Sequence, residues 1–146
     1  MKKILITFAL LVSSHTSFGA HHETDEGLTL EKRQADAVLT ITNVDLGDDV
    51  STISAKGIMG EYGTVYVTYH FTYNADRSSG FMTGIGRGAI DADTVVAGAS
   101  NGIWTREGST IKIRQVVQVS NGTQNLDVID IDILKDTFVV KAYTLK

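Results

Sequence analysis

The 146-residue sequence contains no cysteine and no proline. Without cysteine the fold must be stable without disulfides, which is feasible for a domain of this size. A lipobox anchor is excluded for the same reason. Proline is tolerated at sheet edges but not in central strands, so its absence is compatible with a closed barrel, which has no edges.

Long apolar runs are also scarce. The one clear example, Ile4–Val12, follows a basic start and precedes small polar residues ending at Gly19. It is too short to span a bilayer, which takes roughly 20 residues. The pattern is typical of a secretory signal peptide over residues 1–19, cleaved after Gly19. We therefore expect a secreted or periplasmic protein without a membrane anchor, with a flexible polar leader over residues 20–35 and a β-barrel domain over residues 36–146.

Basic residues are fewer than acidic ones, 13 against 17, which gives a net charge of −4. An acidic chain without a basic run is a poor candidate for binding nucleic acid or anionic lipid. Common catalytic and phosphate-binding motifs are missing too. The glycines at Gly84, Gly86 and Gly88 fall in a predicted strand with no helix after it, unlike a dinucleotide fingerprint. We expect no cofactor, and the sequence assigns no catalytic residue.

One possible metal site depends on processing. Cleavage after Gly19 would expose Ala20, His21 and His22 as a new N-terminus. The terminal amine, deprotonated amides and a histidine at the third position can chelate Cu²⁺ or Ni²⁺. His21 and His22 are therefore candidate metal ligands.

The chain from Ala37 onward has a hydrophobic period of two. Turn residues separate eight predicted strands, and Asn121-Gly122 is typical of a type I′ hairpin. The gaps are too short for a βαβ crossover. This predicts an all-β fold, an eight-stranded antiparallel up-and-down barrel. The predicted strands span residues 37–44, 50–58, 62–73, 80–90, 94–104, 110–120, 124–134 and 137–145.

Three strands alternate clearly between apolar and polar residues, and their apolar faces should line the lumen. These faces hold Val65, Val67, Tyr69, Phe71 and Tyr73; Ile111, Ile113, Gln115, Val117 and Val119; and Ile129, Ile131 and Ile133.

Another wall of the predicted barrel has almost no side chains. Gly84, Gly86 and Gly88 share one face of their strand. A tight hairpin would bring Ala97, Ala99 and Asn101 opposite them. Such a wall either lets bulky neighbours pack closely or leaves space for a ligand, and both interpretations stay open.

Polar residues on an inward face are informative, because burial is costly unless they are paired. Tyr69, Asn101 and Gln115 are candidate polar groups of a ligand site, together with the three glycines. Asp127 belongs to the same inward set, but its place near a strand end favours a solvated carboxylate. The expected ligand is a small hydrophobic molecule with a carboxylate or carbonyl end.

Two segments, Thr94–Val117 and Tyr62–Tyr73, resemble a Gly-rich hairpin and the strand before it in allene oxide cyclase-like barrels. This resemblance implies an eight-stranded barrel, calycin-like in architecture, with an apolar cavity and a tendency to oligomerise. Enzymes of that family cyclise unsaturated lipids or polyketides.

Three classes of function follow. The first is binding of a small hydrophobic molecule in the lumen. The second is a cyclase or isomerase that acts by holding a reactive substrate in one conformation. The third is a structural or homo-oligomeric module, with Tyr66, Val96 and Val116 on its outer surface.

Overall fold

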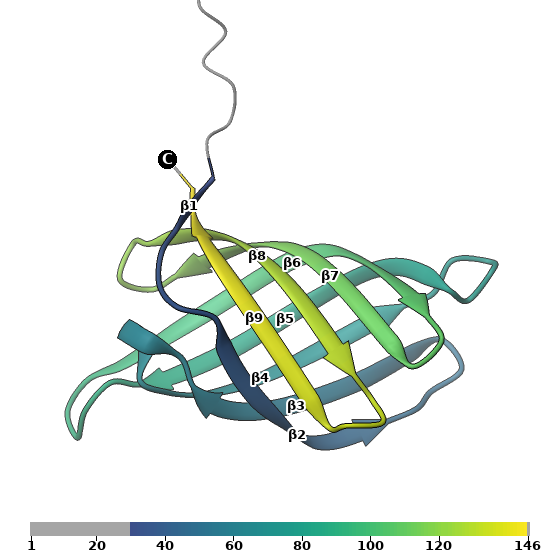
Figure 1. Ribbon diagram of the computed structural model, residues 1–146, viewed down its shortest axis with the longest axis horizontal. Helices are drawn as coiled ribbons and strands as arrows, with labels where there is room; N and C mark the ends of the chain where they lie inside the picture. Colours follow the sequence, from purple (N-terminus) through teal and green to yellow (C-terminus); the bar gives the residue numbers. More distant parts are fainter. Residues whose placement is uncertain (1–29, 146) are drawn as a thin grey trace, which may run out of the picture.

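The computed structural model describes residues 30–145, which form nine β-strands and one short 3-10 helix (Figure 1). Eight strands follow one another around a barrel in chain order, each antiparallel to the next, so the predicted up-and-down barrel is confirmed. The barrel strands are β2 (Ala37–Asp45), β3 (Val50–Ile58), β4 (Thr64–Thr72), β5 (Ser79–Ala89), β6 (Val95–Glu107), β7 (Thr110–Val119), β8 (Gln124–Asp132) and β9 (Thr137–Thr144), and the helix η1 (Gly60–Tyr62) lies between β3 and β4.

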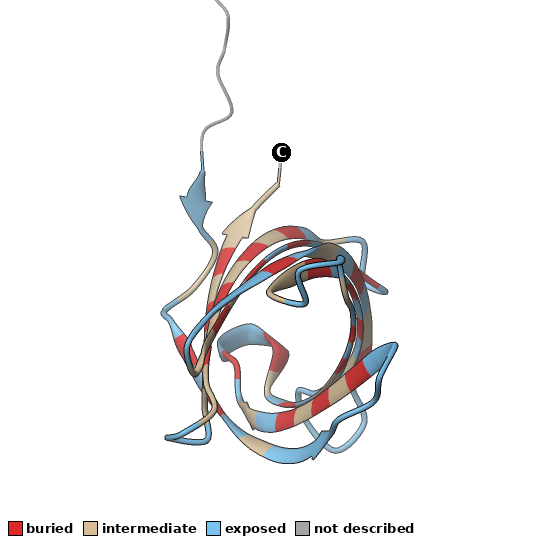
Figure 2. Ribbon diagram, turned by 90° about the vertical axis from the view of Figure 1, so that its right-hand side faces the viewer, coloured by how far each residue is buried: buried red, intermediate tan, exposed pale blue. Residues whose placement is uncertain are grey.

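Strand β9 closes the barrel by pairing with β8 on one side and with β2 on the other. Val140 lies opposite Ile129 of β8 and opposite Ala37 of β2. Figure 2 shows the resulting ring, in which buried and less buried residues alternate along the strands. Each predicted strand overlaps an observed one. The largest difference is at the end of β6, which reaches Glu107 instead of ending at Trp104.

The ninth strand lies upstream of the barrel proper. Strand β1 (Glu31–Lys32) pairs with the end of β9, and the backbone N–H of Arg33 donates to the carbonyl of Ala142 at 2.9 Å. The hydrogen bonding of the barrel therefore extends upstream of residue 36, into the segment 20–35 expected to be a leader. Within residues 30–145 no helix has the length and apolar character to span a membrane. The predicted signal peptide lies outside the described residues.

The lumen is filled at its middle by large side chains. Ile113, Ile129 and Phe138 have no exposed surface. Phe138 stacks on Tyr69 with ring centroids 5.4 Å apart, and Phe71 meets the edge of another ring, Trp104, at 5.7 Å. The inward faces predicted for β4, β7 and β8 are thereby confirmed. Free space remains toward the two ends of the barrel, on either side of this packed middle.

The predicted face of β6 is wrong. The inward residues of this strand are Val96, Gly98, Ser100, Gly102 and Trp104, whereas Asn101 is exposed. The hairpin before β6 explains the difference, because Ala89 pairs with Val95 and leaves a five-residue loop.

That loop is held by its own hydrogen bonds. The N–H of Ile90 donates to the carbonyl of Thr94, and the Asp91 carboxylate accepts from the N–H groups of Asp93 and Thr94. The resulting register brings Gly84 opposite Ser100 and Gly86 opposite Gly98. A shift of one residue reverses every side chain of a strand, so Val96 also points inward and not to the outer surface.

Candidate functional site

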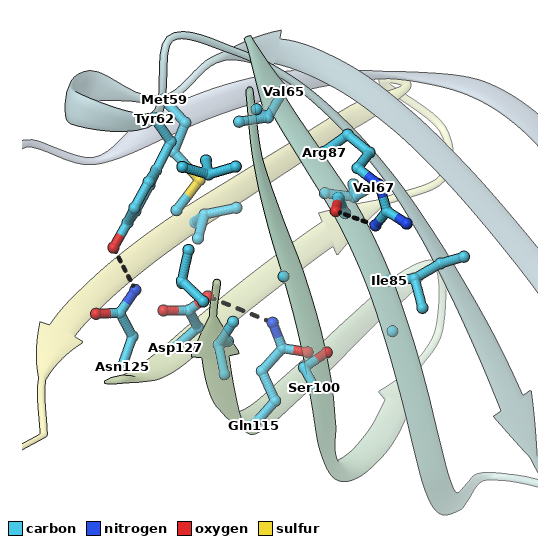
Figure 3. Close-up of a pocket in the computed structure, with 18 of the residues that line it drawn as sticks. Met59, Tyr62, Val65, Val67, Ile85, Arg87, Ser100, Gln115, Asn125 and Asp127 are labelled. Atoms are coloured by element: carbon cyan, nitrogen blue, oxygen red, sulfur yellow. Dashed lines mark hydrogen bonds between the residues drawn. The ribbon is translucent and has the colours of Figure 1, made fainter. Parts of the chain in front are cut away.

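A cavity of about 80 Å³ lies in the lumen at the barrel end covered by η1, and we call it the η1-end cavity. One water needs roughly 10–15 Å³ of such space, so the cavity exceeds the need of a single water several-fold. Met59 and Tyr62 cover it from the η1 side (Figure 3). Its walls are mainly aliphatic and include Leu39, Val65, Val67, Val96, Val117, Val119 and Val140.

The glycine wall is partly filled and partly empty. A Cβ atom at Gly84 would lie 2.5 Å from the ring of Tyr69, so this glycine makes room for a packed tyrosine. At Gly88 a Cβ would lie 2.5 Å from the carbonyl oxygen of Tyr62. The cross-strand neighbours Gly86 and Gly98 differ: a Cβ at Gly86 would lie a tight 3.3 Å from Val67, whereas at Gly98 it would make only an ordinary 3.7 Å contact with Val117. Close packing is therefore observed at Gly84 and Gly88, while the interpretation that the wall leaves space for a ligand stays a prediction.

A polar cluster borders this space. Gln115 of β7 and Asp127 of β8 are direct cross-strand partners, so their side chains leave the sheet side by side. The Nε2 of Gln115 donates to the hydroxyl of Tyr69 at 3.1 Å and to the Oδ2 of Asp127 at 3.3 Å. Figure 3 shows Gln115 and Asp127 pointing toward each other in the lumen. All three residues are at least 95% buried.

Burial dominates the electrostatics of this cluster. It raises the pKa of the Asp127 carboxyl from 3.8 to about 6, against the hydrogen bond from Gln115 and the positive charge of Arg33, which both lower it. Burial, and next the charge of Asp127, also raise the pKa of the Tyr69 hydroxyl, which stays protonated at neutral pH. At pH 7 the cavity therefore contains a buried carboxylate beside a phenol.

Two buried oxygens of the cluster have no hydrogen-bond partner within the described chain: Oε1 of Gln115 and Oδ1 of Asp127. Leaving a buried acceptor unpaired costs about 1–3 kcal/mol. Both atoms can accept a hydrogen bond from a bound molecule. The Tyr69 hydroxyl accepts from Gln115 and keeps its own hydrogen to donate. The cluster can thus serve a group that both donates and accepts.

A second polar group closes the η1 end. Asn125, also buried, donates to the hydroxyl of Tyr62 at 3.0 Å and accepts from Nε of Arg33. Arg33 also pairs with Glu61 at 3.3 Å. The segment upstream of β2 is thus connected to η1 and to β8, and the positive charge of its Arg33 lowers the pKa of Asp127.

The structure places the sequence-predicted site residues as follows. Tyr69, Gln115, Gly84, Gly86 and Gly88 border the η1-end cavity. Asn101 does not, because it lies on the outer face of β6. His21 and His22 lie outside the described residues. Residues 30–145 contain no group of three or more side chains suited to hold a metal ion.

Sequence reasoning missed the importance of Asp127, which is 4% exposed and not a solvated strand end. A signal was present, because the inward face defined by Ile129 and Ile131 continues through Asp127 to Asn125. Tyr62 of η1 contacts Asn125 at this end of β8, and the sequence carries no comparable signal for that packing.

Comparison of the chain with protein-family models, curated proteins and solved structures finds no match. The resemblance of Thr94–Val117 and Tyr62–Tyr73 to allene oxide cyclase-like barrels stays a prediction.

Proposed function

We propose that this chain is a β-barrel that binds a small, mostly apolar molecule in the η1-end cavity, through a hydroxyl group on that molecule. The single observation that carries the proposal is the pair of unpartnered buried oxygens on Gln115 and Asp127, beside an apolar space. A ligand hydroxyl donates to one of these two oxygens and accepts from the Tyr69 hydroxyl, so it pairs one unpartnered acceptor and the free donor of the cluster.

The charge of Asp127 favours this ligand over the carboxylate-bearing one expected from the sequence. With a pKa of about 6, the Asp127 carboxyl is mostly ionised at pH 7.5. A ligand carboxylate next to it would bring two like charges together in a poorly solvated space, which is strongly unfavourable. The small volume of the cavity also limits the bound part to a few heavy atoms.

The test compares three molecules with one chain and different head groups: pentan-1-ol, pentanoate and pentylammonium. Backbone amide shifts are followed by NMR at pH 7.5. We expect pentan-1-ol to shift the amides of Gly86 and Gly98, and pentanoate to leave them unchanged. Pentylammonium measures how far the charge of Asp127 alone attracts a ligand. Equal binding of pentanoate and pentan-1-ol, or no shift with any of them, would overturn the proposal.

A pair of neighbouring variants provides the control. In Gly98→Val the new side chain enters the cavity, where a Cβ makes only an ordinary 3.7 Å contact with Val117. In Ala99→Val the same side chain points to the outer surface. We expect the first variant to lose pentan-1-ol binding and the second to keep it.

A second candidate function, proton-transfer catalysis of the cyclase or isomerase type, is favoured by one specific observation. An acid with a pKa of about 6 next to a protonated phenol, inside an apolar cavity, is suited to general acid–base chemistry. Native mass spectrometry of protein from its own host distinguishes the two functions. A binder releases the molecule that it captured, whereas an enzyme converts it, and Asp127→Asn should then abolish conversion but not capture.

A further inference from the structure

The opposite end of the lumen holds a larger cavity of about 420 Å³, which we call the Trp104-end cavity. Its size lies within the roughly 300–1,000 Å³ range of small-molecule sites. It is bounded by the ends of β4 and β6, the starts of β3 and β7, and the loops between them. The view in Figure 2 looks at the barrel from this side. The packed middle of the lumen separates it from the η1-end cavity.

The side chains on the floor of this cavity present mainly apolar surface. Phe71, Trp104 and Ile111 are buried and line it, and the ring of Tyr73 meets that of Trp104 edge to face at 5.6 Å. The polar groups of the floor are already paired. The indole N–H of Trp104 donates to the carbonyl of Thr72 at 2.9 Å, and the hydroxyls of Ser51 and Tyr73 bond to each other. The floor therefore offers surface mainly for an apolar group, and its one spare donor is a hydroxyl hydrogen of the Ser51–Tyr73 pair.

The rim of this cavity carries charged side chains. Among residues 30–145, Arg77 and Arg106 are the only charged residues that line the cavity, and both are exposed. The Arg77 guanidinium lies 4.5 Å above the Tyr73 ring and donates once, to the carbonyl of Asp48 at 3.0 Å. Neither guanidinium forms an ion pair with another residue of the described chain. Each guanidinium has five N–H donors, and most of them remain available to an anion.

Acidic side chains at this end lie outside the lining of the cavity: Asp45, Asp48 and Asp49 around the β2–β3 loop, Asp76 in the β4–β5 loop, Glu107 at the end of β6, and Asp132 and Asp136 around the β8–β9 loop. Glu107 pairs with Lys112 at 3.2 Å, and the Asp76 carboxylate accepts hydrogen bonds from Ser78 and Ser79. Neither acid lines the cavity. Arg77 also has a φ of +55°, a conformation that glycine adopts more easily. The guanidinium is thus present at a position where the backbone favours another residue.

We infer that the Trp104-end cavity is a second binding site, which takes a medium-chain carboxylate with its tail on the aromatic floor and its head group between Arg77 and Arg106. Arginine is suited to this role because its planar N–H groups match a carboxylate in pairs. This site is independent of the η1-end cavity, and its ligand is an anion, which the η1-end cavity disfavours.

The only tryptophan of the chain, Trp104, provides a specific readout, since it lines this cavity and not the other one. Decanoate, below its micelle concentration, and decan-1-ol, below its solubility limit, are titrated at pH 7.5 against tryptophan fluorescence. We expect both to change the emission and decanoate to bind about tenfold more tightly, the size of one charge-assisted hydrogen bond. Added salt should weaken decanoate binding and leave decan-1-ol binding unchanged.

Variants then assign the preference to the rim. Arg77→Gly relieves the positive-φ strain, so it should stay folded, and together with Arg106→Gln it should remove the preference for decanoate. A control with the same loss of charge on the outer surface, Lys56→Gln with Arg114→Gln, should keep it. Equal affinity of the two ligands, or no fluorescence response, overturns the proposal. A failure of pentan-1-ol to bind at the η1 end would not affect this outcome.

Discussion

The substitution Asp127→Asn tests the electrostatics of the lumen most quantitatively. The carboxyl of Asp127 has a pKa of about 6 in the folded protein and 3.8 as its ordinary value, because it is buried beside an apolar space. Below pH 3.8 the group is protonated in both states and imposes no penalty. As the pH rises from about 4 to about 6, the unfolded chain loses its proton first, so folding stability falls. The full loss corresponds to about 3 kcal/mol, at about 1.4 kcal/mol per pKa unit.

Asparagine has the same shape and no charge. The free energy of unfolding of Asp127→Asn at pH 7.5 should therefore exceed that of the parent protein by up to about 3 kcal/mol. Its new amide can also donate to the unpaired Oε1 of Gln115. The difference between variant and parent should shrink toward pH 4. Urea unfolding followed by Trp104 fluorescence at pH 4, 5, 6 and 7.5 measures it.

The matched control is Asp130→Asn, three residues along the same strand. The side chain of Asp130 is 41% exposed and pairs with Lys141 at 3.4 Å, so its loss should change stability by less than about 1 kcal/mol. The carboxylates of Asp76, Asp91 and Asp132 have lowered pKa values and favour folding as the pH rises, so only differences between variants are compared. The reasoning is refuted if Asp127→Asn destabilises the protein at pH 7.5, or if its effect does not depend on pH.

Three further substitutions test the packing of the lumen. Phe138→Ala should lower the free energy of unfolding by about 3–5 kcal/mol in urea titrations, because this side chain is fully buried, and a loss under 1 kcal/mol would contradict a packed middle. Gly84→Ala should cost about 1–3 kcal/mol in thermal unfolding, because its Cβ would lie 2.5 Å from Tyr69, and an unchanged melting temperature would contradict that contact. Tyr62→Phe leaves Nδ2 of Asn125 without its acceptor, so η1 amides should exchange faster with solvent, and unchanged exchange would show that this bond does not hold η1 in place.

The barrel was predictable because the patterns that specify its strands and turns each lie within a short stretch of the sequence. Alternation in β4, β7 and β8 specifies which side chains face the lumen, and turn residues mark the limits of each strand. Tyr69 and Gln115 could be identified as candidate site residues because each places a polar group within an otherwise apolar series on an inward face. The same alternation contained Asp127, but whether a strand end is solvated depends on what covers it.

The remaining features depend on contacts between distant segments. The inward face of β6 was wrong because it rests on the length of one hairpin loop, and one residue of register exchanges Asn101 for Ser100. The cover at the η1 end joins Arg33, Glu61 and Asn125, which are far apart in sequence. The Trp104-end cavity likewise combines Arg77 and Arg106 from separate loops and strands. No local pattern encodes such pairings.

The central claim is that the η1-end cavity receives a ligand beside Gly98. Intermolecular NOEs between pentan-1-ol and the methyl groups of the isotope-labelled protein test it most directly. We predict contacts with the methyls of Val67 and Val117, which line that space inside the barrel. NOEs confined to the exposed side chain of Ile85, or none at ligand concentrations that shift the amides, would contradict the account.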